Sequence, residues 1–377
     1  LALPTIASKE SIIRVYDHDV QGRTVIRPLV GPRLDGPNDA AVIRPRLDSD
    51  RGIAIGCGLC PQLSDVDPYW MAWHAIDEAI RNVVAVGGDP RRTAILDNFC
   101  WGRPDEPRRL GELVRAAQAC HDAARVCGVP FISGKDSLNN EFAFQPADAA
   151  VLRAAMARYG LTLNADATRL AIPGTLLISA VALVDDVHRC VTADLKQAGA
   201  PLYLVGQPTR PPGRDASGRP EFDPEVAHRT HLLAAELIRD GLAAAVHDVS
   251  DGGLLVALAE MAIAGDRGLH VHGFDDWAWE EEELDRSPLL VGGEGAEAGA
   301  FYFDEMPALY LIEPRLERYD EFRRRVRTAP SLLIATVEPD VPPHAAEFRF
   351  DVPTTSEAIA RVPLGELRDI WQAPLRG

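Results

Sequence analysis

Positive charge, aromatic side chains and long apolar runs are all scarce in this chain of 377 residues. It has 39 Lys and Arg residues against 56 Asp and Glu, a formal net charge of −17, and 6% aromatic residues. A chain this acidic is not expected to bind nucleic acid or an anionic membrane through its general charge. No apolar run approaches the roughly 20 residues that a membrane-spanning helix needs, and the first residues carry no signal-peptide pattern. The sequence therefore predicts a cytoplasmic protein without a nucleic-acid or membrane partner.

The six cysteines are scattered and do not form a recognisable metal-binding pattern. Cys57 and Cys60 make one CxxC, but no second pair or nearby histidine cluster completes a zinc site. Cys120 and Cys127 fall on the apolar stripe of a helix predicted over 107–127, so we expect both to be core thiols in a reducing compartment. The chain also lacks a P-loop, and it has no GxGxxG between a strand and a helix.

The order of apolar patterns predicts an α+β protein of at least two domains. Strands and helices do not alternate strictly, which favours α+β over a doubly wound sheet. Asp223 followed by proline is a typical helix start, and 207–220 and 280–300 read as loops. We place a leading segment at 1–37, a first domain at 38–187 and a second domain at 188–377. The expected elements of the first domain are strands at 40–44, 52–56, 92–96, 131–134 and 176–184 and helices at 68–86 and 107–127.

Residues 247–253 form the most informative motif, because Asp and Ser precede two glycines and an apolar helix follows at once. Such an oxygen-rich turn against a helix N-terminus can hold phosphate and its metal, and we consider Asp248 and Ser250 as its candidate ligands. The alternative is an ordinary helix cap, with Ser250 or Asp251 as the N-cap residue. The motif alone leaves both open.

Two further places in the chain offer oxygen ligands of the kind that a hard cation prefers. Asn38 and Asp39 stand at a turn that leads into an apolar strand. Glu78 and Asn82 are four residues apart, so both side chains lie on one face of a predicted helix whose apolar continuation indicates that it is largely buried. The alternatives are a turn residue that binds local backbone donors and a solvated polar face.

The remaining candidates are Asp97, expected at the end of a strand, and the segment 133–137. In that segment Gly134 would let a phosphate approach the backbone and Ser137 would supply a hydroxyl donor, although a plain β-turn is an equal alternative. No single motif is decisive. Together these residues suggest a nucleotide phosphate held through Mg²⁺, without a P-loop.

The order of the motifs resembles the phosphoribosylformylglycinamidine synthase family, within the aminoimidazole-ribonucleotide-synthetase superfamily. The likeness rests on Ser-Lys-Glu and Tyr-Asp-His near the start and on Leu-Gly-Glu-Leu-Arg-Asp-Ile-Trp near the end, with further motifs between them. Those further motifs are Asp-Ala-Ala-Val-Ile-Arg from residue 39, Asp-Pro-Tyr at 67–69, Glu-Ala-Ile-Arg-Asn from 78, Gly-Lys-Asp-Ser-Leu from 134 and His-Asp-Val-Ser-Asp-Gly-Gly from 247. The family enzyme has two related halves, and this chain is similar to the second.

The resemblance implies two sites. Asp97, Gly134 and Ser137 match positions of the productive site, with Asp97 and Gly134 toward ATP and Ser137 toward the substrate. The second, auxiliary site holds a structural ATP or ADP with Mg²⁺. The positions that match its nucleotide-binding residues are Asn38, Asp39, Asp248 and Ser250, and those that match its metal ligands are Asp39, Glu78, Asn82 and Asp248.

The implied activity is an ATP-dependent ligase reaction of purine biosynthesis, in which glutamine-derived ammonia converts formylglycinamide ribonucleotide to formylglycinamidine ribonucleotide. The implied partners are the first half of the synthase and a glutaminase domain or subunit, and pairing of the chain with itself is a further possibility. The family's catalytic histidine belongs to the first half, so no catalytic residue is assigned and the chain alone is expected to be inactive. The alternatives are a structural, nucleotide-holding half and another superfamily enzyme such as aminoimidazole ribonucleotide synthetase.

Overall fold

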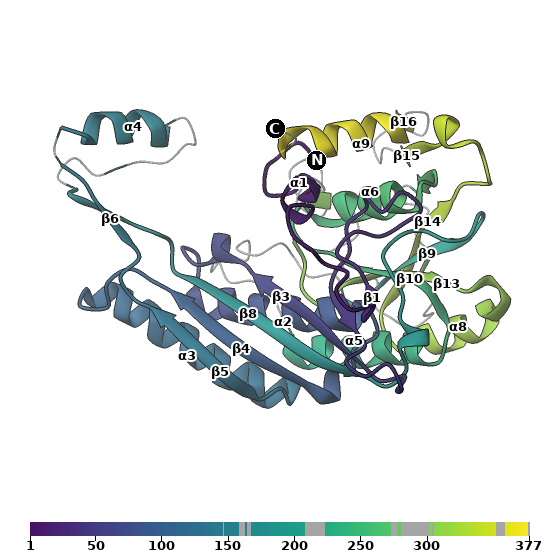
Figure 1. Ribbon diagram of the computed structural model, residues 1–377, viewed down its shortest axis with the longest axis horizontal. Coiled ribbons are helices and arrows are strands. Elements are labelled where there is room, and N and C mark those ends of the chain that lie inside the picture. Colours follow the sequence, from purple (N-terminus) through teal and green to yellow (C-terminus); the bar gives the residue numbers. More distant parts are fainter. Residues whose placement is uncertain are drawn as a thin grey trace.

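The structure is a computed structural model that describes residues 1–145, 147–157, 163, 167–207, 223–272, 278–279, 302–303, 305–351 and 359–375. These residues form two large β-sheets with helices packed on them, and a small two-stranded sheet that carries a helix at one end of the molecule (Figure 1). The α+β class predicted from the sequence is confirmed. The first sheet takes its strands from residues 24–184 and the second from residues 201–363.

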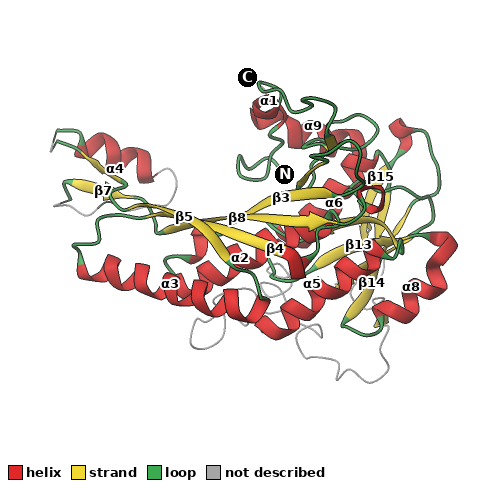
Figure 2. Cartoon of the chain, turned by 60° about the horizontal axis from the view of Figure 1, so that its bottom comes forward, coloured by secondary structure: helices red, strands yellow, loops and turns green. Residues whose placement is uncertain are grey.

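The first sheet has the strand order β1-β2-β3-β8-β4-β5. All neighbouring strands are antiparallel except β4 and β5, which are parallel. Residues of β8 alternate between buried and less buried, because α2 and α3 lie along only one face of the sheet (Figure 2). The strands are β1 (Thr24–Ile26), β2 (Ala41–Ile43), β3 (Gly52–Leu59), β4 (Thr93–Cys100), β5 (Phe131–Ser137) and β8 (Thr175–Val184).

The helices of this part begin and end at residues suited to those positions. Asp67 caps α2 by accepting a hydrogen bond from the Tyr69 N–H at 2.9 Å, and proline follows at the first helical position. The C-cap of α3 is Gly128 in the left-handed region, at φ 67°. The elements are α1 (Glu10–Ile13), α2 (Pro68–Ala85), α3 (Pro107–Cys127) and, at the end of the molecule away from the second sheet, β6 (Glu141–Ala143), α4 (Ala149–Ala157) and β7 (Arg169–Ala171).

The second sheet has the order β10-β13-β9-β14-β11-β15-β16, with β12 paired to β14. Its strands bury both faces, as β9 shows: Leu202 and Leu204 pack with α6 and α9, whereas Tyr203 and Val205 pack with α5 and α8. The strands are β9 (Pro201–Val205), β10 (Ala243–Asp248), β11 (Leu269–Val271), β12 (Ala278–Trp279), β13 (Tyr310–Pro314), β14 (Ser331–Val337), β15 (Glu347–Asp351) and β16 (Ile359–Pro363). The helices are α5 (Pro224–Arg239), α6 (Gly253–Gly265), α8 (Tyr319–Val326) and α9 (Leu364–Gln372).

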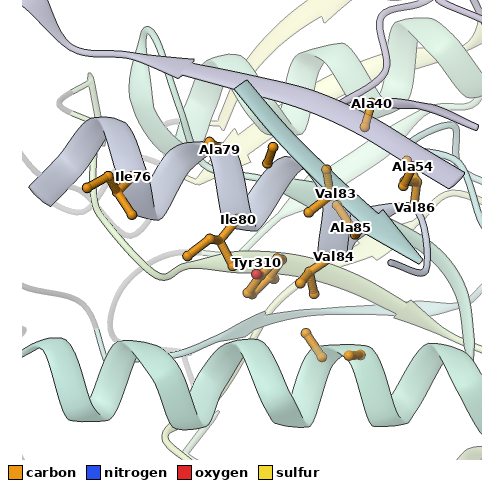
Figure 3. Close-up of a cluster of buried hydrophobic side chains, with 14 of the residues drawn as sticks. Ala40, Ala54, Ile76, Ala79, Ile80, Val83, Val84, Ala85, Val86 and Tyr310 are labelled. Atoms are coloured by element: carbon orange, nitrogen blue, oxygen red, sulfur yellow. The ribbon is translucent and has the colours of Figure 1, made fainter. Parts of the chain in front are cut away.

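Helix α2 joins the two sheets into one hydrophobic core. Ile80 and Val84 lie on the side of α2 nearer Tyr310 of β13, and Val83 lies toward Ala54 of β3 (Figure 3). All five side chains are less than 2% exposed. Because α2 is covered on both sides, its polar residues are held in fixed positions between the sheets.

The two ends of the chain lie together over α6 (Figure 1). The Trp371 indole donates to the Ile6 carbonyl at 3.0 Å, and the Ser8 N–H donates to the Trp371 carbonyl at 2.9 Å. Arg368 of α9 contacts Asp35 at 3.4 Å and Asp266 at 2.9 Å. The leading segment is therefore fixed to the last helix of the chain.

Most elements expected from the sequence are present, and the differences concern strand ends. Asp97 is expected at the end of a strand, but β4 continues to Cys100. The segment 133–137 does not form the β-turn that was one alternative, because β5 runs through to Ser137. Cys120 and Cys127 are buried as expected. Almost all of the predicted loop at 207–220, and all of that at 280–300, lies outside the described residues.

None of the helices in the described ranges combines the length and the apolar character needed to cross a membrane.

The buried histidine of α2 makes the stability of the fold depend on pH. Burial lowers the pKa of His74 to about 4 from 6.5, and it outweighs the raising effect of the neighbouring Asp77; Arg81 adds a smaller lowering effect. Between these two pKa values the unfolded chain binds a proton at His74 and the folded protein does not. The contribution of His74 to the unfolding free energy, on the order of 3 kcal/mol, is therefore present above pH 6.5 and lost as pH falls toward 4. In urea titrations between pH 7.5 and 5, His74→Asn should show a smaller fall in unfolding free energy than the wild type. His121→Asn is the control because that ring is already exposed, and equal slopes for wild type and His74→Asn would contradict the prediction.

Candidate functional site

A cavity of about 300 Å³ lies between the leading segment, the β10–α6 turn and α2. Its volume is at the lower end of the range for small-molecule sites. Five residues predicted from the sequence as ligands line it: Asn38, Asp39, Asn82, Asp248 and Ser250. The rest of the wall comes from Thr5, Ile6, Ala7, Lys9, Ile13, Pro28, Leu29, Pro37, His247, Asp251, Glu260 and Trp371.

Asp39 has one oxygen engaged and one oxygen free. Its Oδ1 lies 2.6 Å from Nδ1 of His247 and 3.4 Å from the backbone N–H of Asp248. The side chain is only 1% exposed, and its buried Oδ2 has no hydrogen-bond partner among the residues that the structure describes. A buried carboxylate oxygen without a partner is costly, so this atom indicates a site for a bound cation.

The two asparagines of the wall, Asn38 and Asn82, differ in which side-chain polar atoms remain available for a ligand. The Asn82 amide donates to the Cys57 carbonyl at 2.7 Å, so its remaining polar atom is the Oδ1 oxygen. Both ends of the Asn38 amide are engaged, with the Ala40 carbonyl at 3.0 Å and the Ala193 N–H at 2.9 Å. Asn38 therefore ties the wall of the cavity to the connector that leads to the second sheet.

The turn before α6 leaves the start of the helix without a side-chain cap. The N-cap is Gly252, at φ 88°, and neither Ser250 nor Asp251 accepts a hydrogen bond from the first turn. The cap alternative for these two residues is therefore wrong. The N–H of Gly253, the first residue of α6, donates to the Ser250 carbonyl at 2.9 Å. The next N–H groups have no side-chain cap, and a helix N-terminus of this kind favours an anion.

Arg81 lies at the centre of a buried ionic network behind the cavity. Its guanidinium contacts Asp77 at 2.7 Å, Glu305 at 3.1 Å and Asp248 at 3.4 Å, and it has no exposed side-chain area. Asp77 in turn contacts Nε2 of His231 at 3.0 Å. The network connects α2 of the first sheet with α5, β10 and the residues before β13.

The network sets the ionisation of the site. Burial and the neighbouring Asp39 raise the pKa of Asp248 to about 7, against the opposing effect of Arg81. Burial would raise the pKa of Asp77, but Arg81 and His231 outweigh it and hold that pKa at about 2. Arg81 therefore keeps Asp77 ionised, whereas the pKa of Asp248 stays near neutral because burial and Asp39 outweigh the effect of the arginine.

Glu78 is the predicted ligand that the structure does not place on the wall of the cavity. Its carboxylate accepts a hydrogen bond from the Leu59 N–H at 2.6 Å and lies 3.6 Å from the Cys60 thiol, which also contacts Glu305. Burial and Glu305 raise the pKa of Glu78 well above its usual value. Glu78 is connected to Asp248 through Glu305 and Arg81.

Asp97, Gly134 and Ser137 lie together elsewhere, on β4 and β5 of the first sheet. Asp97 and Gly134 are partners across the two parallel strands, and a Cβ on Gly134 would lie 2.5 Å from an Asp97 carboxylate oxygen. Burial raises the pKa of Asp97. Ser137 accepts a hydrogen bond from Lys135. The structure thus separates the two sets of residues that the sequence suggested.

Sequence reasoning missed Arg81, Glu305, His247 and Lys9. The one local signal was the i, i+4 spacing of Asp77 and Arg81 on a helix expected to be buried, which favours an ion pair. The contacts of Glu305 with Arg81 and of His247 with Asp39 join residues more than 200 positions apart, so no local pattern could indicate them.

Both parts of the chain match known families. Residues 37–158 match the family described as AIR synthase related protein, N-terminal domain, and residues 190–282 match AIR synthase related protein, C-terminal domain. The phosphoribosylformylglycinamidine synthase subunit PurL of Rhodopseudomonas palustris (strain BisB18) is 32% identical over 319 residues, which cover 82% of this chain and 36% of the relative. The corresponding subunit of Azorhizobium caulinodans is 30% identical over 339 residues, which cover 87% of this chain and 39% of the relative. The chain thus spans well under half the length of these relatives.

Solved structures show the same fold. Thermotoga maritima PurL complexed with ADP has a TM-score of 0.61 at 19% identity, covering 95% of this chain and 49% of that chain. The structure of PurLQS from Thermotoga maritima has a TM-score of 0.61 at 18% identity, covering 89% of this chain and 47% of that chain.

Replacing the buried arginine should destabilise the fold strongly. We expect Arg81→Ala to lower the unfolding free energy by about 3–5 kcal/mol, because it leaves buried carboxylates without a counter-charge. Arg115→Ala is the control: Arg115 pairs with Asp67 at 2.8 Å but is half exposed, so its loss should cost about 1 kcal/mol or less. Urea unfolding at pH 7.5 measures both, and similar losses for the two variants would show that the buried network is not special.

Proposed function

This chain belongs to the AIR synthase related proteins and contains both their N-terminal and C-terminal domains. From this premise we propose that it is one half of a phosphoribosylformylglycinamidine synthase. We also propose that it holds ATP or ADP through Mg²⁺ in the cavity at Asp39 and Asp248. The relatives at 30–34% identity are PurL subunits, and PurL of T. maritima is known in complex with ADP. We also propose the divisions 1–37, 38–187 and 188–377.

The observation that carries the nucleotide proposal is the free Oδ2 oxygen of Asp39 in an acidic cavity. Asp251 and Glu260 also line this cavity, and Lys9 is the one Lys or Arg among the described residues of its wall. Phosphate would be repelled by such a wall unless a cation lay between them. The oxygens of Asp39, Asp248 and Asn82 are hard ligands of the kind that Mg²⁺ takes, so the residues present fit this metal.

Within this site each part of the chain has a separate task. Bound Mg²⁺ would neutralise phosphate charge next to Asp39 and Asp248. The uncapped start of α6, beside Ser250, would supply backbone donors to a phosphate oxygen. The apolar part of the wall, which includes Ile6, Leu29 and Trp371, would exclude water from the nucleoside end. Glu78 joins the metal ligands only if its carboxylate turns away from Leu59.

We assign the productive site of the whole synthase to Asp97, Gly134 and Ser137. Asp97 and Gly134 would contact ATP and Ser137 the formylglycinamide ribonucleotide. In the reaction of the whole enzyme, ATP would activate the carbonyl oxygen of the glycinamide group that is attached to the ribose. Ammonia would then displace phosphate from that carbon to form the amidine, and the formyl group would stay unchanged. A group that stabilises the charge of the transferring phosphoryl must come from elsewhere, because these three residues supply no cation.

The face of the first sheet opposite α2 and α3 is where we place the first half of the synthase. Apolar side chains of three strands stay exposed there or at its edge: Ile55 and Leu59 of β3, Ile132 of β5 and Leu183 of β8, each 41–62% exposed. Exposed apolar residues that follow one sheet face mark a protein interface. The first half would be part of the same protein or a separate chain, and a glutaminase would supply ammonia. A second copy of this chain is the alternative occupant.

A purely structural role as a nucleotide-holding half is the second candidate function. It is favoured by the separation of the two residue sets. The oxygen ligands of the cavity all come from this chain, whereas Asp97, Gly134 and Ser137 lie outside the cavity, so nucleotide could be held there independently of the productive site. The two functions are compatible, since the auxiliary nucleotide would stabilise the half that completes the productive site.

Nucleotide binding should depend on the cavity and not on the β4–β5 residues. Titration calorimetry with ADP and Mg²⁺ should detect binding to the wild type, and Asp39→Asn and Asp248→Asn should weaken it about tenfold or more, because each removes a charge from the metal. Asp97→Asn is the matched control and should bind as the wild type does. Absence of binding to the wild type would refute the proposed site.

The chain alone should not turn over substrate. Incubated with formylglycinamide ribonucleotide, ATP, Mg²⁺ and ammonium, it should release no phosphate above background, and addition of the first half of a related synthase should restore release. Substitution of Ser137 by Ala should lower the restored rate, whereas Ser49→Ala, on an exposed loop, should not. Turnover by the isolated chain would contradict this assignment.

A further inference from the structure

His247 holds the carboxylate that carries the free oxygen. It is the next-to-last residue of β10, and its side chain is 6% exposed. Its Nδ1 lies 2.6 Å from Oδ1 of Asp39, and its Nε2 lies 3.3 Å from Oε2 of Glu260 on α6. The ring therefore connects the loop before β2, the end of β10 and helix α6.

These contacts fix the protonation and the orientation of the ring. An ionised carboxylate only accepts hydrogen bonds, so a ring nitrogen that faces one must carry a proton. Both nitrogens of His247 face carboxylates, so the ring donates at both and carries a positive charge. A rotation of the ring by half a turn would place C–H groups against Asp39 and Glu260 and lose both hydrogen bonds.

The same contacts fix the orientation of Asp39. Its Oδ1 receives His247 Nδ1–H and lies near the Asp248 N–H, so the other oxygen is left without a donor. A carboxylate free to rotate would exchange its two oxygens. With one oxygen held in this way, Oδ2 keeps a single position in the wall of the cavity.

We propose that His247 is a positioning residue that fixes the Oδ2 oxygen of Asp39 for a divalent cation, and that this role depends on the Nδ1 donor rather than on the contact with Glu260. The inference rests on the proposed nucleotide–Mg²⁺ site. Partners that orient metal ligands are worth about 10–100-fold in metal affinity, although they do not touch the metal.

Packing alone does not explain a charged ring at this place. The preceding residues of β10, from Ala243 to Val246, are all apolar and buried, and the strand partner of His247 is Leu311. An apolar side chain would fill the same volume without the desolvation of a charge. What only His247 adds is a pair of donors aimed in two directions, one at Asp39 and one at Glu260.

The two donors can be separated by substitution. In His247→Asn the amide nitrogen takes about the place of Nδ1 and can still donate to Asp39. In His247→Gln the amide nitrogen reaches about as far as Nε2, so it can donate to Glu260 but not to Asp39. His247→Ala removes both donors, and Glu260→Gln keeps the ring and its contact with Asp39.

Mn²⁺ is the probe, because its free form is counted by electron paramagnetic resonance with or without ADP. We expect His247→Ala and His247→Gln to weaken Mn²⁺ binding about 10–100-fold, and His247→Asn and Glu260→Gln to remain within about threefold of the wild type. His231→Asn is the matched control: His231 is also buried and contacts a carboxylate, Asp77, but it does not reach Asp39. It should lower the thermal midpoint without changing Mn²⁺ affinity.

The outcome separates this inference from the function on which it rests. If the wild type binds no Mn²⁺, the proposed function fails. If the wild type binds and His247→Gln binds equally well, or if the Asn and Gln variants are weakened alike, the positioning role is overturned and the metal site stands. Failure of both amide variants to fold would overturn it too, since His247 would then be a residue of the core.

Discussion

The guanidinium of Arg81 is the point on which the arrangement of the two sheets depends. A side chain with no exposed area holds carboxylates from α2, from the end of β10 and from the residues before β13. Separately, each of these carboxylates would be costly to bury, and so would the arginine. Together they are tolerable only in one geometry, so the network selects a single placement of the second sheet against α2. Hydrophobic contacts between α2 and Tyr310 supply attraction but little directional preference.

The same arginine connects the fold to the proposed site. Asp248 is shared between the buried network and the cavity, with Arg81 behind it and Asp39 in front. In a chain with a net charge of −17, the overall electrostatic field repels a nucleotide phosphate. The excess of acidic residues on the cavity wall increases this repulsion locally. A cation between the wall and the phosphate removes this repulsion, because it attracts the carboxylates and the phosphate at the same time. The guanidinium of Arg81 is paired with carboxylates on the side of Asp248 that faces away from the cavity, so it is not placed to contact the phosphate.

How much of this could be predicted depended on whether the signal was local. Helix α2 was predicted almost to the residue, because a long apolar pattern follows an N-cap and a proline. Asp39, Asn82 and Asp248 were found as hard oxygen ligands by residue type, and the cavity brings them together. Asp97 was misplaced at a strand end because a strand of alternating burial can continue through polar residues on its open face. Glu305 and His247 were not found, because Arg81 and Asp39, the residues on which their roles depend, lie more than 200 positions away in the sequence.

The leading segment shows why a local pattern was not enough even for the site itself. Residues 1–37 were assigned from the sequence only as a leading segment, yet they contribute Ile6, Lys9 and Leu29 to the cavity wall. They can do so only because Trp371 and Arg368 of the last helix hold them over α6. The wall of the cavity is thus completed by the two ends of the chain, whose positions are set by each other and by the α6 helix beneath them. A site that binds at a helix N-terminus needs such a cover, because backbone donors are strong toward an anion only where water is excluded. The leading segment and the last helix, which are far apart in the sequence, thus come together to exclude water from the side of the cavity next to α6.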